Sequence, residues 1–124
     1  MEVLMNKELF NLVEICHSNI KNSKECLEYL KNRGIDLDII SKYKIGYFPQ
    51  NLNTLSKYVD FDVLKKNKII RVDGMSDYRD YNYLIIPIFD EYANIIGICG
   101  RTLMSKEEVK LFGIPKYRNS SFEK

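Results

Sequence analysis

The sequence lacks the residues and patterns that zinc sites, membrane-spanning segments and secretory signals require. It has one histidine, His17, and no Cys-x-x-Cys pair, which argues against a zinc site at Cys16–His17. No apolar stretch approaches the roughly 20 residues that span a bilayer, and the segment from Met1 to Glu8 lacks the basic-then-apolar order of a secretory signal. Three scattered cysteines fit buried free thiols better than disulfides. We therefore expect a cytoplasmic protein with no membrane partner.

The chain also has no large excess of charge of either sign. Its net charge is +2 at pH 7, so nucleic-acid binding would require cations gathered on one face. Hydrophobic residues make up 45% and charged residues 29% of the 124 residues, a composition typical of a folded protein rather than a disordered one. We expect a single domain over 1–124, in which 1–22 form an N-terminal helix and a connection and 23–124 form the main body.

Helical signals dominate the first half of the chain. Apolar residues recur at helical spacing from Asn6 to His17. Ser23 is a suitable N-cap for a second helix and Gly34 a suitable stop for it. Asp36 can cap a short third helix. Two further short helices are expected, over 51–59 and 60–67.

Strand signals dominate the second half. Brief strands are expected over 45–48 and 69–72, and Leu84–Phe89 and Ile95–Leu103 should form a β-hairpin. Pro87 cannot donate to the strand ladder, so it should lie at an edge or a bulge. The fold class is therefore α+β, with short helices packed on a small mixed or antiparallel sheet around a central hairpin.

The isoleucines of this hairpin are the densest apolar group in the chain. We expect Ile86 and Ile96 to belong to the stability core and Ile20 to matter less. Because both strands are apolar on both faces, helices or another domain should cover them.

The C-terminal third carries the pattern that most suggests ligand binding. An apolar strand ends in Gly97-Ile98-Cys99-Gly100-Arg101, and glycines let a backbone approach a ligand closely. The segment Lys116-Tyr117-Arg118-Asn119, interpreted as a loop, brings together two cations, an aromatic ring and an amide. Cations and amides suit phosphate oxygens, and an aromatic face suits a stacked base. The alternative is a solvated arginine at a strand end and a loop that docks on the sheet.

Four aspartates invite a two-metal interpretation, namely Asp73, Asp77, Asp80 and Asp90. Two of them, Asp73 and Asp90, lie in expected turns, where short acidic side chains bond to the local backbone. No converging acidic cluster and no nucleophile paired with a base is visible. We therefore expect no metal site in this chain.

The motifs, taken in order, resemble one family. They are Tyr29-Leu30, Arg33-Gly34-Ile35, Ile45-Gly46-Tyr47-Phe48-Pro49, Ile86-Pro87-Ile88-Phe89-Asp90, Ile96-Gly97-Ile98-Cys99-Gly100-Arg101 and Lys116-Tyr117-Arg118-Asn119-Ser120. Together they resemble, over about residues 25–124, the N-terminal subdomain of the RNA-polymerase core of DnaG-type DNA primases from bacteria and phages. Their order and gaps are more specific than any single motif.

The resemblance implies part of an enzyme that synthesises RNA primers on single-stranded DNA during replication. It implies packing against a TOPRIM domain, where Mg or Mn would serve nucleotidyl transfer. The implied partners are the single-stranded DNA template, the RNA primer, the TOPRIM domain or subunit and the replicative helicase. We expect this chain alone to bind no cofactor and to be inactive.

The resemblance also assigns site residues. Expected nucleic-acid contacts are Arg101, Lys116, Tyr117, Arg118 and Asn119, with Arg79 and Lys124 as weaker members and Gly97 and Gly100 for close backbone approach. Only Tyr117 among the nine tyrosines has sequence neighbours suited to stacking on nucleic acid. Arg33 is interpreted as a structural residue at a helix end.

Three departures from the family pattern matter. Tyr83 stands where an arginine is usual, which would move a phosphate contact to Arg79, and Cys99 replaces the middle glycine. The resemblance would place the TOPRIM acidic residues after Lys124, so we expect an excised subdomain or a stand-alone relative. The alternative function is a protein-interaction module on a primase-like scaffold that binds a replication protein, which would expose an apolar patch instead of a basic face.

Overall fold

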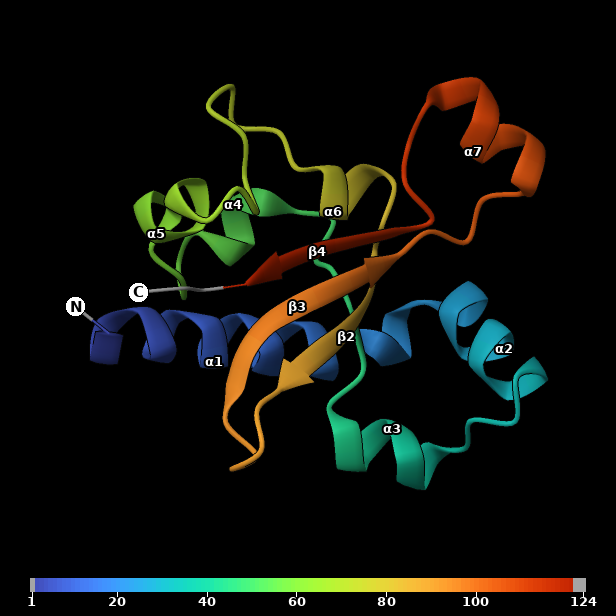
Figure 1. Cartoon of the computed structure of the whole chain (residues 1–124), viewed down its shortest axis with the longest axis horizontal. Helices are drawn as coiled ribbons and strands as arrows, with labels where there is room; N and C mark the ends of the chain where they lie inside the picture. Colours follow the sequence, from blue (N-terminus) through green and yellow to red (C-terminus); the bar gives the residue numbers. More distant parts are fainter. Residues whose placement is uncertain (1, 122–124) are drawn as a thin grey trace.

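Short helices surround a four-stranded antiparallel sheet with the strand order β1-β2-β3-β4 (Figure 1). The computed structural model describes residues 2–121, with side chains for residues 7–120. The helices are α1 (Glu2–Ser18), α2 (Lys24–Asn32), α3 (Leu37–Tyr43), α4 (Leu52–Leu55), α5 (Phe61–Lys66), α6 (Asp77–Asp80) and α7 (Lys106–Phe112), with a 3-10 turn at Ile20–Asn22. The strands are β1 (Gly46–Tyr47), β2 (Leu84–Phe89), β3 (Ile95–Arg101) and β4 (Tyr117–Ser121). The predicted α+β class is confirmed.

Polar side chains begin the helices where the sequence predicts. At the start of α2, Ser23 Oγ accepts a hydrogen bond from the Cys26 backbone N–H at 3.1 Å. Asp36 caps α3 in the same way, and Asn51 and Asp60 cap α4 and α5. These bonds satisfy N–H groups that have no partner inside the helix, which is why local sequence placed the helix starts well. None of the helices in the described part of the chain is long and apolar enough to cross a bilayer.

The predicted strand over 69–72 is wrong. The backbone N–H groups of Ile69 and Ile70 both donate to the Leu64 carbonyl, at 2.9 and 3.3 Å, so this segment closes the C-terminus of α5. Both isoleucine side chains are buried in the core. Because the backbone N–H groups of this apolar pair are hydrogen-bonded to the end of α5, the pair needs no neighbouring strand.

Helix α7 was not predicted, although its signal is present in the sequence. Ser105 and Glu108 form a capping box, in which the Ser105 hydroxyl accepts from the Glu108 N–H at 3.1 Å and the Glu108 carboxylate accepts from the Ser105 N–H at 3.0 Å. In Figure 1 the helix stands away from the sheet, at the upper right. None of its side chains is buried, and Leu111 is 79% exposed.

The hairpin of β2 and β3 forms as predicted, and Pro87 lies where its missing N–H is tolerated. Strand β1 pairs only with Ile85 and Leu84, so Pro87 lies beyond the part of β2 that has neighbours on both sides. Its only register partner is Ile98 of β3. The expectation of an edge position is confirmed.

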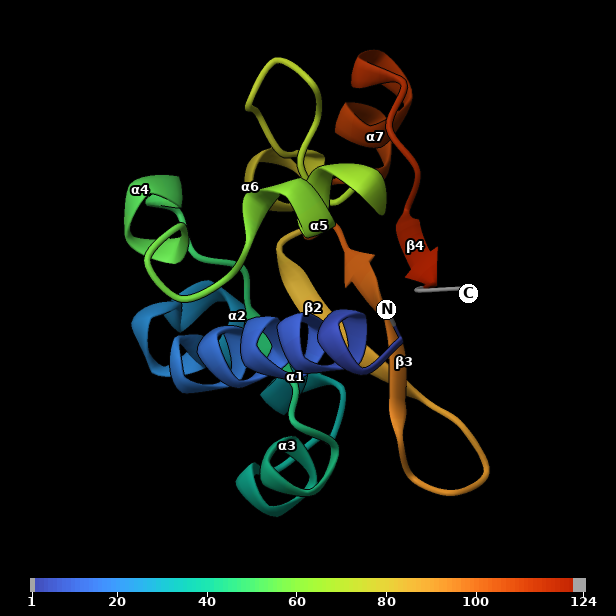
Figure 2. The same ribbon diagram turned by 90° about the vertical axis from the view of Figure 1, so that its left-hand side faces the viewer.

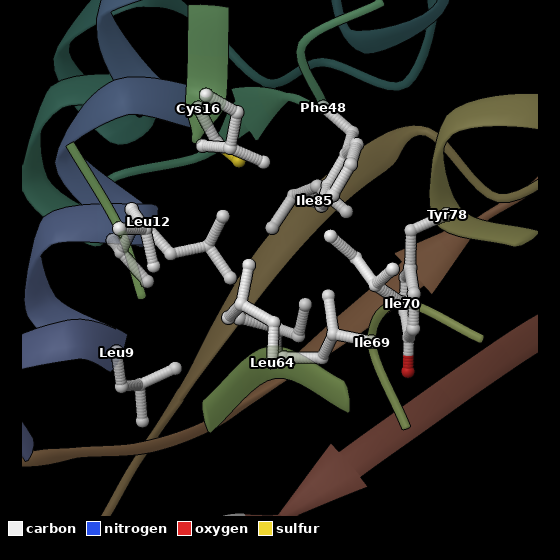
Figure 3. Packing of buried hydrophobic residues seen from close by; sticks show 13 residues of the cluster. Leu9, Leu12, Cys16, Phe48, Leu64, Ile69, Ile70, Tyr78 and Ile85 are labelled. Atoms are coloured by element: carbon white, nitrogen blue, oxygen red, sulfur yellow. The ribbon is translucent and has the colours of Figure 1, made fainter. Parts of the chain in front are cut away.

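The main core lies between α1 and one face of the hairpin (Figure 3). Leu9, Leu12 and Cys16 of α1 belong to the same buried cluster as Ile85 and Ile98. Segments from α4, α5 and α6 complete it, through Leu55, Leu64, Ile69, Ile70 and Tyr78. In Figure 2 the N-terminal helix crosses in front of β2. The predicted cover for one face of the sheet is therefore α1.

The core does not contain the isoleucines that the sequence analysis favoured. Ile96 is 39% exposed and Ile86 is half-buried, whereas Ile20 is buried. For Ile96 the reason is a register shift: Ile88 pairs with Gly97 and Phe89 with Ile95, which leaves Ile96 without a partner. Ile96 is thus the extra residue of a β-bulge, and a bulge interrupts the alternation of side chains between the two faces of the sheet. Ile86 follows the buried Ile85 in the strand, so its side chain lies on the other face of the sheet.

Burial keeps the core thiols protonated, and this predicts a loss of stability at alkaline pH. Burial raises the pKa of Cys26 to about 11 from its ordinary 9.0, with the Ser23 hydrogen bond opposing the shift, and burial also raises the pKa of Cys16. These thiols ionise more readily in the unfolded chain than in the folded protein. Their contribution to the free energy of unfolding is therefore complete below pH 9.0 and is lost as the pH rises toward the folded pKa values. We expect the urea midpoint to fall between about pH 8 and about pH 10.5, and to fall less in Cys26→Ala. A midpoint that is constant over this interval would contradict the assignment.

Candidate nucleic-acid interface

The face of the sheet opposite α1 carries an alternating stack of arginines and tyrosines. The Arg33 Cζ atom lies 5.1 Å from the centre of the Tyr29 ring on α2. The Arg101 Cζ atom, at the end of β3, lies 5.3 Å from the same ring and 5.2 Å from the Tyr117 ring on β4. These distances are within the range of attraction between a cation and an aromatic face. We call Arg33, Tyr29, Arg101 and Tyr117 the arginine–tyrosine stack.

Arg101 is the buried centre of this stack. Its residue is 7% exposed, its Nη1 donates to the Thr102 carbonyl, and its Nε has no hydrogen-bond partner among the described residues. The alternative of a solvated arginine at the strand end is wrong, because the Tyr29 and Tyr117 rings flank the Arg101 side chain. The exposed members are Arg33 and Tyr117, and the latter is 49% exposed.

A buried asparagine fixes the backbone beside the stack. Asn82 is fully buried, and its Nδ2 donates to the carbonyls of Gly100 at 3.1 Å and Pro115 at 3.0 Å, with the Lys116 carbonyl at 3.5 Å. The Thr102 N–H also donates to the Lys116 carbonyl, at 3.1 Å. Lys116 is therefore held by its main chain, while its side chain is exposed to solvent.

Gly100 serves this internal arrangement. A Cβ atom at Gly100 would lie against the Asn82 carbonyl oxygen and 2.7 Å from the Tyr78 ring. Its lack of a side chain therefore lets Asn82 and Tyr78 approach β3, and the close approach is to the chain's own residues rather than to a ligand. Gly97 is buried in β3, opposite Ile88.

The segment predicted as a loop is the edge strand β4, and its residues divide between two faces. Tyr117 pairs with Arg101 and Asn119 pairs with Cys99, so both lie on the stack's face. Arg118 lies on the other face, where its Nε donates to Asn82 Oδ1 at 3.4 Å and its Nη1 is 3.6 Å from Asp77 Oδ2. The predicted residues therefore do not form one continuous wall.

Of the two weaker predicted members, the structure describes Arg79, which is not part of the stack. Arg79, on α6, donates from Nε to Asp80 Oδ1 at 2.8 Å, and 19% of its side chain is exposed. Lys124 lies outside the described residues. Within residues 2–121 no group of three or more His, Cys, Asp or Glu side chains is arranged to hold a metal ion.

Tyr83, the residue for which the sequence resemblance implied an arginine, has an internal partner. Its hydroxyl donates to Glu25 Oε1 at 2.6 Å. Burial and this bond to a carboxylate raise the pKa of Tyr83, and burial also raises the pKa of Tyr78 to about 12. Both phenols are therefore neutral at physiological pH, and neither replaces the cation of an arginine.

The sequence analysis missed Tyr29 and Asn82. Tyr29 and Arg33 are four residues apart on α2, and this helical spacing was an available signal for their contact. Arg33 is thus part of the stack and not only a helix-ending residue. The contact of Tyr29 with Arg101 joins segments far apart in sequence, and local patterns carry no signal for it.

Comparison with known proteins places the chain in a family. The family described as "DNA primase catalytic core, N-terminal domain" matches residues 15–124. The chain belongs to this family. The sequence resemblance to a DnaG-type primase subdomain is confirmed.

Relatives and solved structures agree with this assignment. The DNA primase of Buchnera aphidicola is 30% identical over 117 residues, covering 89% of this chain and 19% of the relative. That of Legionella pneumophila is 31% identical over 103 residues, covering 80% and 17%. This primase-family chain thus spans about a fifth of the length of these relatives.

The fold is that of solved primase cores. The crystal structure of the Aquifex aeolicus primase, with zinc-binding and RNA polymerase domains, matches with a TM-score of 0.76 and 25% identity, over 96% of this chain and 29% of that one. A DnaG primase catalytic domain bound to single-stranded DNA matches with a TM-score of 0.73 and 20% identity, over 96% and 39%. The latter likeness concerns the fold alone.

Proposed function

We propose that this chain is the part of a DNA primase that holds single-stranded DNA while a TOPRIM domain performs metal-dependent nucleotidyl transfer. The observation that carries the proposal is the arginine–tyrosine stack, whose exposed ring, Tyr117, directly follows Lys116 in the chain, and the Lys116 side chain is also exposed. A DNA-bound structure of a primase domain with this fold supports it.

Each part of the surface has a distinct role in this proposal. Tyr117 offers a ring face to a base, and Arg101 behind it holds the ring in place. Arg33 in the stack and Lys116, next to Tyr117 in sequence, supply charge for phosphates, and Asn119 adds an amide on the face of Tyr117. The described residues hold no acidic cluster for Mg or Mn, so the proposal gives this chain a binding role and no metal-dependent step.

Two variants test the roles of charge and stacking separately. Lys116→Gln should weaken binding of a labelled single-stranded oligonucleotide on all sequences and make the salt slope shallower by about 0.7, as loss of one phosphate contact on a single strand does. Tyr117→Ala should cost about 1–3 kcal/mol with little dependence on salt, as loss of a stacked base does. Fluorescence anisotropy at several salt concentrations measures both.

Matched controls come from the turn that follows α4, where Lys57 and Tyr58 are exposed. Lys57→Gln and Tyr58→Ala should bind as the wild type does. If the wild type does not bind, or if the site variants bind as well as their controls, the proposal fails. The protein-interaction module then takes its place, with α7 and its exposed Leu111 and Phe112 as its contact surface.

A further inference from the structure

We propose that a second basic hollow, between the end of α5 and the edge strand β4, binds phosphates of the same single-stranded nucleic acid. The inference rests on the proposed function and extends it to residues outside the arginine–tyrosine stack. The hollow measures about 400 Å³, and its lining includes Lys66, Asn67, Lys68, Arg118, Asn119 and Ser120. We call it the α5–β4 hollow.

The hollow gathers three cations from two distant segments. Lys66 ends α5, Lys68 follows it, and Arg118 comes from β4. Both lysines are exposed, and neither forms an ion pair within the part of the chain that the structure describes. Arg118 forms an ion pair with Asp77, with 3.6 Å between Nη1 and Oδ2. The two lysines therefore supply most of the unpaired positive charge at the hollow.

Helix capping does not account for all of this charge. A lysine in the last turn, such as Lys66, is stabilised by the negative end of the α5 dipole. Lys68 lies beyond the helix, with φ +62°. This left-handed residue ends α5, because the Lys68 N–H donates to the Lys65 carbonyl and the Ile69 N–H to the Leu64 carbonyl. Glycine is the usual residue in such a position, and here it is a lysine that lines the hollow as a second free cation. A polar hollow with free lysines suits phosphate, which lysine binds as a point charge.

The hollow is also held in place. Ser120 Oγ donates to the Asn67 carbonyl at 2.7 Å, which ties β4 to the segment after α5. Tyr78, buried and neutral, forms part of the lining. The two elements that carry the cations therefore keep a fixed separation, as a site for successive phosphates requires.

The hollow is continuous with the stack across one strand. Tyr117 belongs to the stack, on one face of β4. The next two residues of the strand, Arg118 and Asn119, line the hollow. Because β4 is the last strand of the sheet, no strand in the described chain separates these two faces. A nucleic-acid strand that leaves Tyr117 can cross the edge of β4 and reach Lys66 and Lys68.

Oligothymidylates of two lengths test this path with the whole chain. The double variant Lys66→Gln/Lys68→Gln should bind an oligomer of about 20 nucleotides several-fold more weakly than the wild type. Its salt slope should be shallower by about 1.4, since each neutralised phosphate of a single strand contributes about 0.7. An oligomer of about 5 nucleotides, long enough for one surface only, should bind both proteins equally. The control Lys21→Gln/Lys57→Gln removes the same charge elsewhere and should bind both lengths as the wild type does.

Each other outcome overturns the inference. Unchanged binding of the long oligomer by the double variant would exclude the hollow while leaving the proposed function intact. If the control variant loses as much affinity as the Lys66/Lys68 variant, the loss comes from net charge and not from the hollow. If the Lys66/Lys68 variant loses the same affinity for both oligomer lengths, the hollow is not a separate second contact. A wild type that binds neither oligomer would overturn the proposed function and this inference together, whereas the other failures leave Lys116→Gln and Tyr117→Ala effective.

Discussion

Gly46→Ala should lower the free energy of unfolding by about 3 kcal/mol or more, at the upper end of the cost of overpacking a core. A Cβ atom at Gly46 would lie against the backbone carbonyl group of Cys16 and 2.5 Å from the backbone nitrogen of His17. These are main-chain atoms of α1, so no side-chain rotation relieves the contact. The helix that covers the sheet would have to move away from β1, and urea unfolding followed by circular dichroism measures the loss.

Gly113→Ala is the matched control. Gly113 has φ +65° at the C-terminus of α7, and nothing lies within 4 Å of where its Cβ would be. Alanine there carries only the cost of a left-handed backbone, about 1 kcal/mol. If both variants lose the same stability, the close approach of β1 to α1 is not what requires Gly46.

Ile98→Ala should cost about 2–5 kcal/mol, the range for truncating a large buried aliphatic side chain. Ile98 is fully buried and belongs to the same cluster as the apolar residues of α1. The cavity would open in the middle of the sheet, between Pro87 of β2 and the helix. Thermal or urea denaturation at neutral pH measures the change.

Ile96→Ala, two residues away, provides the comparison. Its side chain is 39% exposed at the bulge, so we expect a loss below about 1 kcal/mol, as for most surface substitutions. Similar losses of stability in Ile98→Ala and Ile96→Ala would mean that the side chains of β3 are distributed differently between the two faces of the sheet. Ile20→Ala should fall with Ile98→Ala rather than with Ile96→Ala, because Ile20 is 8% exposed.

Local physical chemistry explains which parts of the fold could be predicted. Ser23 and Asp36 each satisfy backbone donors a few residues away, so the helix starts follow from short-range sequence. The hairpin follows from two apolar runs and a short loop between them. By contrast, the inward turn of Ile69 and Ile70 depends on space left by α1 and β2 in the core, and no local pattern reports it.

The sequence could predict part of the geometry of the candidate site, while the binding role of its residues stays a prediction. The Arg101 side chain contacts the Tyr117 ring, and the Lys116 carbonyl accepts from the Thr102 N–H, so the two C-terminal motifs do meet. The assignment of Lys116–Asn119 to a loop hid the alternation of β4, which turns Arg118 to the opposite face. Burial of Arg101 depends on Tyr29, which arrives from α2 through tertiary packing.

An isotope-labelled sample titrated with a short single-stranded oligonucleotide tests the central claim most directly. Binding at the arginine–tyrosine stack should shift the backbone amide resonances of Tyr29, Arg101 and residues 116–119, in proportion to the added oligonucleotide and less at higher salt. Amides in the middle of α1, such as that of Leu12, should not move. Shifts confined to α7, or no shifts at all in low salt, would contradict the account.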